Sequence, residues 1–292
     1  MDSASDRSAP PILAEAGPLL RDYDVLFCDV WGVVHNGRKA YAEGCAALTT
    51  YRKRGGTVVL LSNAPRTAKS VARVLDGKGV PTSCWDAIVP SGDLARAYAA
   101  DQDIRRIYHI GPDRDLDVFH DSGLERVSLG EAQAVFCTGL IDDRYETAED
   151  YRLLLEPAIA LALPLICANP DLVVDVGGDL LPCAGAIASV YERMGGVVCW
   201  AGKPYAIAYA AAEKMAFDQR GASVHKSRIL AIGDSVRTDV AGAVNYGIDV
   251  LFIGQGIHRE SIMPGGVFLE KELERLFAGQ PRAISAMETL RW

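Results

Sequence analysis

The feature that most constrains the fold is a set of short, almost continuous apolar runs that alternate with helical stretches. These runs are rich in β-branched residues, which is typical of strands buried on both faces of a parallel sheet. The alternation of strand and helix predicts an α/β chain with a doubly wound parallel sheet. The expected strands are 23–30, 57–61, 197–201, 228–232 and 249–253, and the helices between them include 40–54, 67–78 and 205–217.

The apolar runs are unevenly spaced, and the long interval between the second expected strand and the third includes a segment of about 100 residues, which is enough for a small independent domain. This segment has strand signals of its own at 104–110, 134–138 and 164–168. We therefore expect a Rossmann-like core domain made of residues 1–100 and 199–292, with an α/β cap domain, 101–198, inserted into it. At the chain ends we expect an arm with a short helix over 1–22 and amphipathic helices over 270–292.

Composition excludes several classes of protein. With 292 residues, 49% hydrophobic residues and a formal net charge of -8, the chain has an ample core and no basic face for nucleic acid. The longest weakly polar run, 157–168, is too short to cross a membrane. Seven scattered cysteines without a C-x-x-C pair indicate reduced core thiols, and MDSASDRSAPP lacks the order of a signal peptide. We expect a cytoplasmic protein that binds neither nucleic acid nor membrane.

Polar side chains follow four of the expected strands, where an open parallel sheet binds its ligands. They are Asp29 in FCDVWGVVHNG, Ser62 and Asn63 in LLSNAPR, Lys203 in AGKP, and Asp234 with Asp239 in AIGDSVRTD. We expect them to converge at one edge of the sheet. Each segment alone has an ordinary explanation as a turn, a helix cap or a solvated loop, but the order and placement of all four favour a shared site.

The chemistry of this set is coherent. Carboxylates gathered at one edge repel each other unless a cation lies between them, and Mg²⁺ prefers oxygen ligands. A lysine and a Ser-Asn turn suit phosphoryl oxygens, and a carboxylate can attack phosphorus to give an aspartyl-phosphate. The residues therefore predict a site for Mg²⁺-assisted phosphoryl transfer.

These segments resemble the four motifs of the haloacid dehalogenase-like hydrolase superfamily, in the same order along nearly the whole chain. The 141-residue interval between Ser62 and Lys203 resembles the class IIA group of 4-nitrophenyl and pyridoxal phosphatases, whose cap lies between the second and third motifs. Further segments similar to that group are DVWGVVHNG, VPSGD, ANPD and CAGAIA. The resemblance implies a phosphatase that uses Mg²⁺ and acts on a small phosphorylated substrate, with a homodimer also implied.

The resemblance also implies individual roles. Asp29 is expected to be the nucleophile and a metal ligand, and Asp234 the second carboxylate on the metal. Asp239 is expected to bind through water or to orient its neighbours. Ser62 is expected to donate to the phosphoryl group with support from Asn63, while Lys203 neutralises the aspartyl-phosphate. The cap is expected to close over the substrate. Asn169, Asp171 and Gly185 are its candidates for leaving-group contact, and a simple turn between cap strands explains them equally well.

One position departs from the superfamily pattern. Trp31 stands two residues after Asp29, where the family has the aspartate that protonates the leaving group and later activates water. Its backbone carbonyl can still bind the metal, but an indole is a hydrogen-bond donor only, and losing a general acid/base typically costs about 10²–10⁴ in rate.

Three hypotheses follow from this departure. His35 or water replaces the missing proton carrier, although His35 also suits a loop residue that contacts backbone. Alternatively, the substrates have good leaving groups. In the third hypothesis the chain is a phosphate-ligand-binding or regulatory protein with weak turnover. Halide displacement is disfavoured by the retained Asp234, and a receiver-like phosphorylation module by the large insertion.

Overall fold

The computed structural model describes residues 9–176 and 178–292. The chain divides into two compact units. We call them the core unit, which contains the described residues up to Leu61 together with Arg73–Ile88 and Tyr209–Trp292, and the cap unit, which contains Ser62–Ala72 and Val89–Ala208. The start of the expected N-terminal arm, residues 1–8, lies outside the described residues. The domain limits expected from the sequence stay a prediction.

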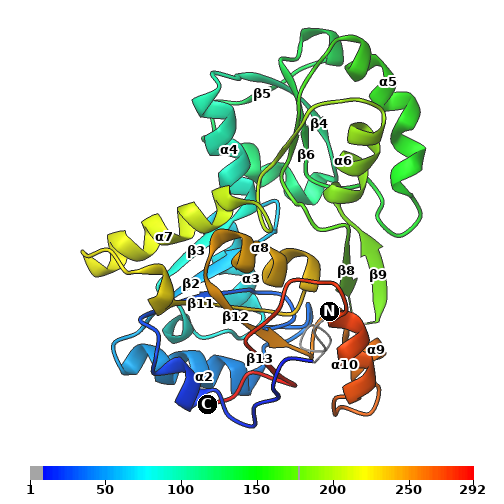
Figure 1. Ribbon diagram of the computed structural model, residues 1–292. Helices are drawn as coiled ribbons and strands as arrows, with labels where there is room; N and C mark the ends of the chain where they lie inside the picture. Colours follow the sequence, from blue (N-terminus) through cyan, green and yellow to red (C-terminus); the bar gives the residue numbers. More distant parts are fainter. Residues whose placement is uncertain (1–8, 177) are drawn as a thin grey trace, which may run out of the picture. The chain divides into compact units, whose positions relative to one another are not determined.

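A six-stranded sheet in the order β13-β12-β11-β1-β2-β3 organises the core unit (Figure 1). The pairings that join β13 through β2 are all parallel. The four apolar runs at 23–30, 57–61, 228–232 and 249–253 all form strands of it, as predicted. The strands are β1 (Val25–Cys28), β2 (Thr57–Ser62), β3 (Ala87–Pro90), β11 (Ile229–Gly233), β12 (Asp249–Ile253) and β13 (Ser285–Met287).

The central strands of this sheet are buried along their whole length. All residues of β1, β2 and β11 are buried, which explains why they read as continuous apolar runs rather than alternating ones. The three helices expected between the strands are present with slightly different ends. The helices are α1 (Gly17–Leu20), α2 (Ala42–Lys53), α3 (Ala68–Gly77), α7 (Ala206–Arg220), α8 (Ala241–Tyr246), α9 (Arg259–Ile262) and α10 (Glu270–Phe277), with short turns η2 (Thr82–Cys84), η6 (Lys226–Arg228) and the π-helical η7 (Val236–Val240).

The cap unit has a second parallel sheet, in the order β10-β7-β6-β4-β5. Its main strands are β4 (Arg106–Ile110), β6 (Ala134–Cys137) and β7 (Leu165–Cys167), with β5 (Glu125–Arg126) and β10 (Val198–Trp200) at the edges. Helices α5 (Arg152–Ala160) and α6 (Ala184–Arg193) pack on this sheet through a buried apolar cluster. The unit also contains α4 (Ser91–Asp101), the antiparallel hairpin β8 (Val173–Val176) with β9 (Asp179–Pro182), and the turns η3 (Asp113–Phe119), η4 (Leu129–Glu131) and η5 (Ala148–Tyr151).

Two expectations about the elements were wrong. The run 197–201 was expected in the sheet of β1, but β10 pairs with β7 in the cap sheet. An apolar run specifies that a strand is buried and leaves open which sheet buries it. The C-terminal stretch was expected to be helical, but after α10 it forms β13, the edge strand beside β12. Among the described residues, no helix has both the length and the apolar character needed to cross a bilayer.

Candidate active site

Three carboxylates lie together in the core unit. Asp29, Asp234 and Asp239 are all buried, and one oxygen from each lies within 4.8 Å of the other two. The adjacent parallel strands β1 and β11 explain this placement, because Cys28 is paired with Ile232, so that Asp29 and Asp234 follow neighbouring strands at the same edge. Asp239 comes from η7, directly after this edge. The convergence expected for these three residues is present.

Backbone N–H groups hold two of these carboxylates in place. Ile257 N–H donates to Oδ2 of Asp234 over 2.6 Å, and Ser235 N–H donates to Oδ2 of Asp239 over 3.1 Å. Glycines allow the backbone to approach so closely: a Cβ on Gly32 would lie 2.3 Å from Oδ2 of Asp234. The peptide that joins Trp31 to Gly32 therefore lies beside the cluster.

The donor set fits a hard divalent cation. Three mutually close, buried carboxylates supply only oxygen atoms, which Mg²⁺ prefers, and their negative charges repel one another unless a cation lies among them. The carbonyl of Trp31, expected from the sequence to bind the metal, is an oxygen donor of the same kind. Asp29, Asp234, Asp239 and the Trp31 carbonyl are thus the groups that would hold the metal.

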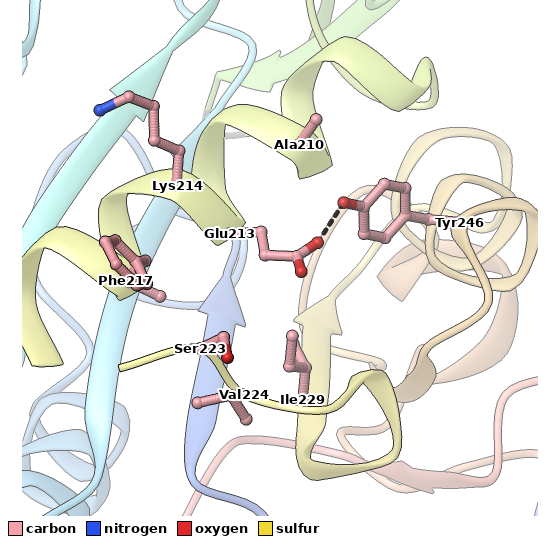
Figure 2. A pocket seen from close by; sticks show the side chains of 9 residues that line it. Ala210, Glu213, Lys214, Phe217, Ser223, Val224, Ile229 and Tyr246 are labelled. Atoms are coloured by element: carbon pink, nitrogen blue, oxygen red, sulfur yellow. Dashed lines mark hydrogen bonds between the residues drawn. The ribbon is translucent and has the colours of Figure 1, made fainter. Parts of the chain in front are cut away.

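Two stacked tyrosines pack next to the turn that carries Asp239. The hydroxyl of Tyr209 donates to the backbone carbonyl of Asp239 over 3.2 Å, and its ring stacks on Tyr246 with centroids 5.4 Å apart. Tyr246 in turn lines a hollow beside α7, where its hydroxyl donates to Glu213 (Figure 2). This hollow includes Ile229 at the start of β11, roughly 15 Å along the strand from the carboxylates. Its walls are mostly apolar, so it is unsuited to phosphoryl chemistry.

Trp31 and His35 are in contact within the loop that follows β1. The two rings meet edge to face with centroids 5.0 Å apart. A Cβ on Gly37 would lie 2.6 Å from Cζ2 of Trp31, so the indole packs directly on that glycine. Gly32 N–H donates to the carbonyl of His35 over 2.9 Å, and the Lys78 ammonium donates to the carbonyl of Gly37. Trp31 is therefore part of the packing of this loop.

His35 is placed for a structural role in that loop. The side chain is 3% exposed, and its Nδ1 accepts the N–H of Gly37 over 2.9 Å. Burial, with a smaller contribution from the charge of Lys78, lowers the pKa of His35 to about 4. The ring is therefore neutral at pH 7, with its proton on Nε2, whereas an efficient proton carrier has a pKa near the working pH.

A second polar cluster lies in the cap unit around Asn63. Lys203 N–H donates to Oδ1 of Asn63 over 2.8 Å, and Nδ2 of Asn63 donates back to the carbonyl of Lys203 over 3.1 Å. The Ser91 hydroxyl also donates to Oδ1 of Asn63, over 3.3 Å, and Nδ2 donates to Oδ1 of Asp171 over 2.9 Å. Asn63 and Lys203, which are 140 positions apart, are thus in direct contact and both buried.

The neighbours of this cluster fix its shape. Ser62 ends β2, and its Oγ accepts the N–H of Ala64 over 3.2 Å, a bond that does not use the hydroxyl hydrogen. A Cβ on Gly202 would lie 2.2 Å from Oγ of Ser91 and 2.6 Å from Oδ1 of Asn63. Only glycine permits the chain before Lys203 to pass so close to these side chains.

The three cap candidates lie together, with Asn169 and Asp171 in one turn and Gly185 packed against it. Oδ1 of Asn169 accepts the N–H of Asp171 over 3.1 Å, and a Cβ on Gly185 would lie 2.4 Å from the carbonyl of Asp171. Gly185 lies in the first turn of α6, so the segment ANPD packs against the beginning of that helix. Within this turn, Asp171 reaches Asn63.

The structure thus places the candidates in two groups. Asp29, Asp234 and Asp239 meet in the core unit, and Asn63, Lys203 and Asp171 meet in the cap unit. Lys203 does follow a strand, but that strand belongs to the cap sheet, so the argument that placed it at the edge of the core sheet was wrong. Sequence reasoning missed the backbone donor Ile257. The signal that could have found it is Gly-Gln-Gly after β12, at the edge where β11 also ends.

Sequence and structure comparisons both find proteins similar to this chain. A model of the haloacid dehalogenase-like hydrolase family matches residues 26–125, and a HAD-hydrolase-like model matches residues 200–274. The crystal structure of a haloacid dehalogenase-like hydrolase from Brucella suis 1330 is 43% identical, with a TM-score of 0.84 over 94% of this chain and 98% of the other. The chain belongs to the haloacid dehalogenase-like hydrolase family. The family resemblance predicted from the sequence is confirmed.

Two less similar proteins also match this chain. The 5'-nucleotidase YutF of Bacillus subtilis is 27% identical over 246 residues, which cover 84% of this chain and 92% of the relative. The 4-nitrophenylphosphatase of Thermotoga maritima is 21% identical, with a TM-score of 0.70 over 93% of this chain and 96% of the other. This last likeness shows the shared fold.

Proposed function

We propose that this hydrolase is a Mg²⁺-dependent phosphatase that hydrolyses small phosphomonoesters through an aspartyl-phosphate. The observation that carries the proposal is the buried cluster of Asp29, Asp234 and Asp239 at the ends of two adjacent parallel strands. Two relatives have names that denote phosphate-ester hydrolysis, the 5'-nucleotidase of Bacillus subtilis and the 4-nitrophenylphosphatase of Thermotoga maritima. Substrate specificity is assigned to the expected cap domain, residues 101–198.

Each side chain has one task in this proposal. An oxygen of Asp29 attacks phosphorus, the ester P–O bond breaks, and the leaving oxygen departs with the bonding electron pair. The Ser62 hydroxyl donates a hydrogen bond to the phosphoryl group, and Lys203 neutralises the negative charge of that group. Water then attacks phosphorus, which releases phosphate and regenerates the Asp29 carboxylate. Mg²⁺, when bound, offsets the charge of the phosphoryl group and of the carboxylates.

The proton transfers limit which esters are good substrates. The indole of Trp31 does not ionise near neutral pH and cannot act as a general acid or base, and the neutral, loop-bound ring of His35 is a poor replacement. We therefore favour esters whose leaving group departs without protonation, with water as the proton acceptor in the second step. We assign His35 to holding the loop, in place of the catalytic role expected from the sequence.

A second function is favoured by the packing of Trp31. Its indole fills the space above Gly37 and contacts His35, so the loop is built around a residue that cannot transfer protons. A protein that binds a phosphate ligand and turns it over only weakly would have this arrangement. Turnover separates the two functions.

The test is a pre-steady-state time course with 4-nitrophenyl phosphate and Mg²⁺, on wild type and Trp31→Asp in parallel. The nitrophenolate leaves without protonation, so wild type should give a stoichiometric burst followed by slower steady turnover. Trp31→Asp should raise the steady rate, because a carboxylate can activate the attacking water. Wild type with neither burst nor turnover would contradict the proposal and favour the ligand-binding function.

A further inference from the structure

The side-chain amide of Asn63 has no hydrogen-bonding capacity left for a substrate. A primary amide offers two N–H donors and two acceptor lone pairs. Both hydrogens of Nδ2 are used, by Oδ1 of Asp171 and by the carbonyl of Lys203. Both acceptor positions of Oδ1 are also used, by the N–H of Lys203 and the hydroxyl of Ser91. The two donors and two acceptors of the Asn63 amide are therefore all bound to protein groups.

This full set of bonds fixes the main chain at Lys203. The Asn63 amide bridges the N–H and the carbonyl of the same residue, which holds the backbone at that point in a single conformation. Lys203 is 3% exposed, so its side chain has little freedom once its backbone is fixed. Asn63 thus holds the backbone from which the Lys203 side chain extends.

Asp171 sets the orientation of the Asn63 side-chain amide. A carboxylate only accepts hydrogen bonds, so it requires the NH₂ group on its own side. The opposite orientation would turn NH₂ toward the N–H of Lys203 and leave two donors facing each other. The Ser91 hydroxyl favours the same orientation through a longer bond of 3.3 Å, compared with 2.9 Å for Asp171.

The main chain of Asp171 is itself held by neighbouring groups. Asn169 accepts its N–H, and the close approach at Gly185 fixes its carbonyl. A fixed carboxylate that orients an amide, which in turn fixes a lysine, is a typical supporting arrangement for a catalytic cation. A contact with the leaving group, as the sequence suggested for Asp171, would use the carboxylate differently.

We propose that Asp171 is a positioning residue for Lys203 that acts through the amide of Asn63. The inference rests on the proposed function, in which Lys203 binds the phosphoryl group. Because that group is common to all substrates, losing Asp171 should slow every phosphate ester by the same factor. A leaving-group contact would instead affect each ester differently.

The experiment compares Asp171→Ala with Asp171→Asn, using phenyl phosphate and 4-nitrophenyl phosphate as substrates. Asp171→Ala removes the acceptor and should lower kcat/KM, which reports the step that expels the leaving group, about 10–100-fold on both esters, since misplacement of a catalytic group by about 1 Å costs up to ~10². Asp171→Asn keeps an acceptor oxygen and should stay within about threefold of wild type. Asp101→Ala, at an exposed aspartate of the same unit, is the matched control.

Ser91→Ala provides a second variant that removes the weaker bond to Asn63. It should lower kcat/KM less than Asp171→Ala does and by the same factor on both esters. Inorganic phosphate should bind more weakly to Asp171→Ala than to wild type, measured by calorimetry, with Asp171→Asn restoring its affinity. This readout does not depend on turnover.

The outcomes separate this inference from the proposed function. Active wild type with an unaffected Asp171→Ala would overturn the inference and leave the function standing. Equal losses in Asp171→Ala and Asp171→Asn, or a loss on only one ester, would also overturn it in favour of direct substrate contact. If wild type shows no turnover, the function fails, and phosphate affinity alone decides the inference.

Discussion

The two polar clusters of this protein are built in different ways. The three carboxylates of the core unit follow β1 and β11, which are neighbours in one parallel sheet, so strand pairing alone brings Asp29 and Asp234 together. The cluster around Asn63 joins four separate segments through side-chain and loop contacts. A site at paired strand ends is a consequence of regular structure, whereas a site made by loops depends on individual hydrogen bonds.

The largest effect should come from breaking the core cluster at its nucleophile. Asp29→Asn removes the attacking oxygen and one of the three carboxylate charges, so turnover of 4-nitrophenyl phosphate should fall by at least about 10⁴-fold. Steady-state kinetics with Mg²⁺ measure this, and the melting temperature checks that the variant is folded. A folded Asp29→Asn variant that keeps a hundredth of wild-type turnover would remove Asp29 from the mechanism.

Disrupting the cluster around Asn63 should lower turnover less than Asp29→Asn does, and it should leave the Mg²⁺ requirement unchanged. Lys203→Met keeps much of the side-chain volume but removes the charge on the phosphoryl group, so kcat should fall about 10²–10³-fold. Titration of activity with Mg²⁺ should give the wild-type half-saturation for this variant. The matched variant Asp234→Asn should need more Mg²⁺, because it weakens a carboxylate ligand. The same change in Mg²⁺ requirement for both variants would contradict the division of tasks between the clusters.

His35→Ala should have only a small effect on chemistry. Its pKa, lowered to about 4 by burial, keeps the ring neutral from pH 5 to 8, so kcat should fall less than tenfold. The pH profile of kcat should show the same inflections in the variant as in wild type over this range. His225→Ala, at an exposed histidine of the same unit, is the control. Loss of a limb near pH 6–7 in His35→Ala would restore His35 as the proton carrier.

The smallest effect concerns His109, a half-buried histidine of the cap unit, and appears in stability. Burial, followed by the charge of Arg126, lowers the pKa of His109 from 6.5 to about 4, so the unfolded chain takes up its proton first as the pH falls. The stability from the neutral ring is therefore complete above pH 6.5 and is lost between pH 6.5 and 4.

Thermal melts of wild type and His109→Gln measure this loss. The difference in melting temperature between them should be largest at pH 7.5 and should shrink as the pH approaches 4.5. His120→Gln, at an exposed histidine of the same unit, is the control. A His109→Gln difference that is independent of pH would show that the ring is not held neutral by burial.

Sequence reasoning succeeded where regular structure determines position. The apolar runs before Asp29 and Asp234 predicted two strands of a parallel sheet, and pairing of those strands places the carboxylates without any further information. It failed for the run 197–201, because burial of both faces is equally compatible with either sheet. The contact of Asn63 with Asp171, 108 positions apart, could not be predicted, since it depends on how a loop after β2 meets a turn after β7.

The sequence by itself determined the fold class, the family and the identity of the acidic cluster. These follow from the alternation of strands and helices and from the residues at strand ends, which are local properties of the chain. It also determined that Trp31 stands where the family has an acid. Only the tertiary structure decided that this indole packs on Gly37 and that His35 is neutral and bound to the loop. Burial and hydrogen-bond partners arise from segments that meet only in the folded chain, and they set the pKa and orientation on which each role depends.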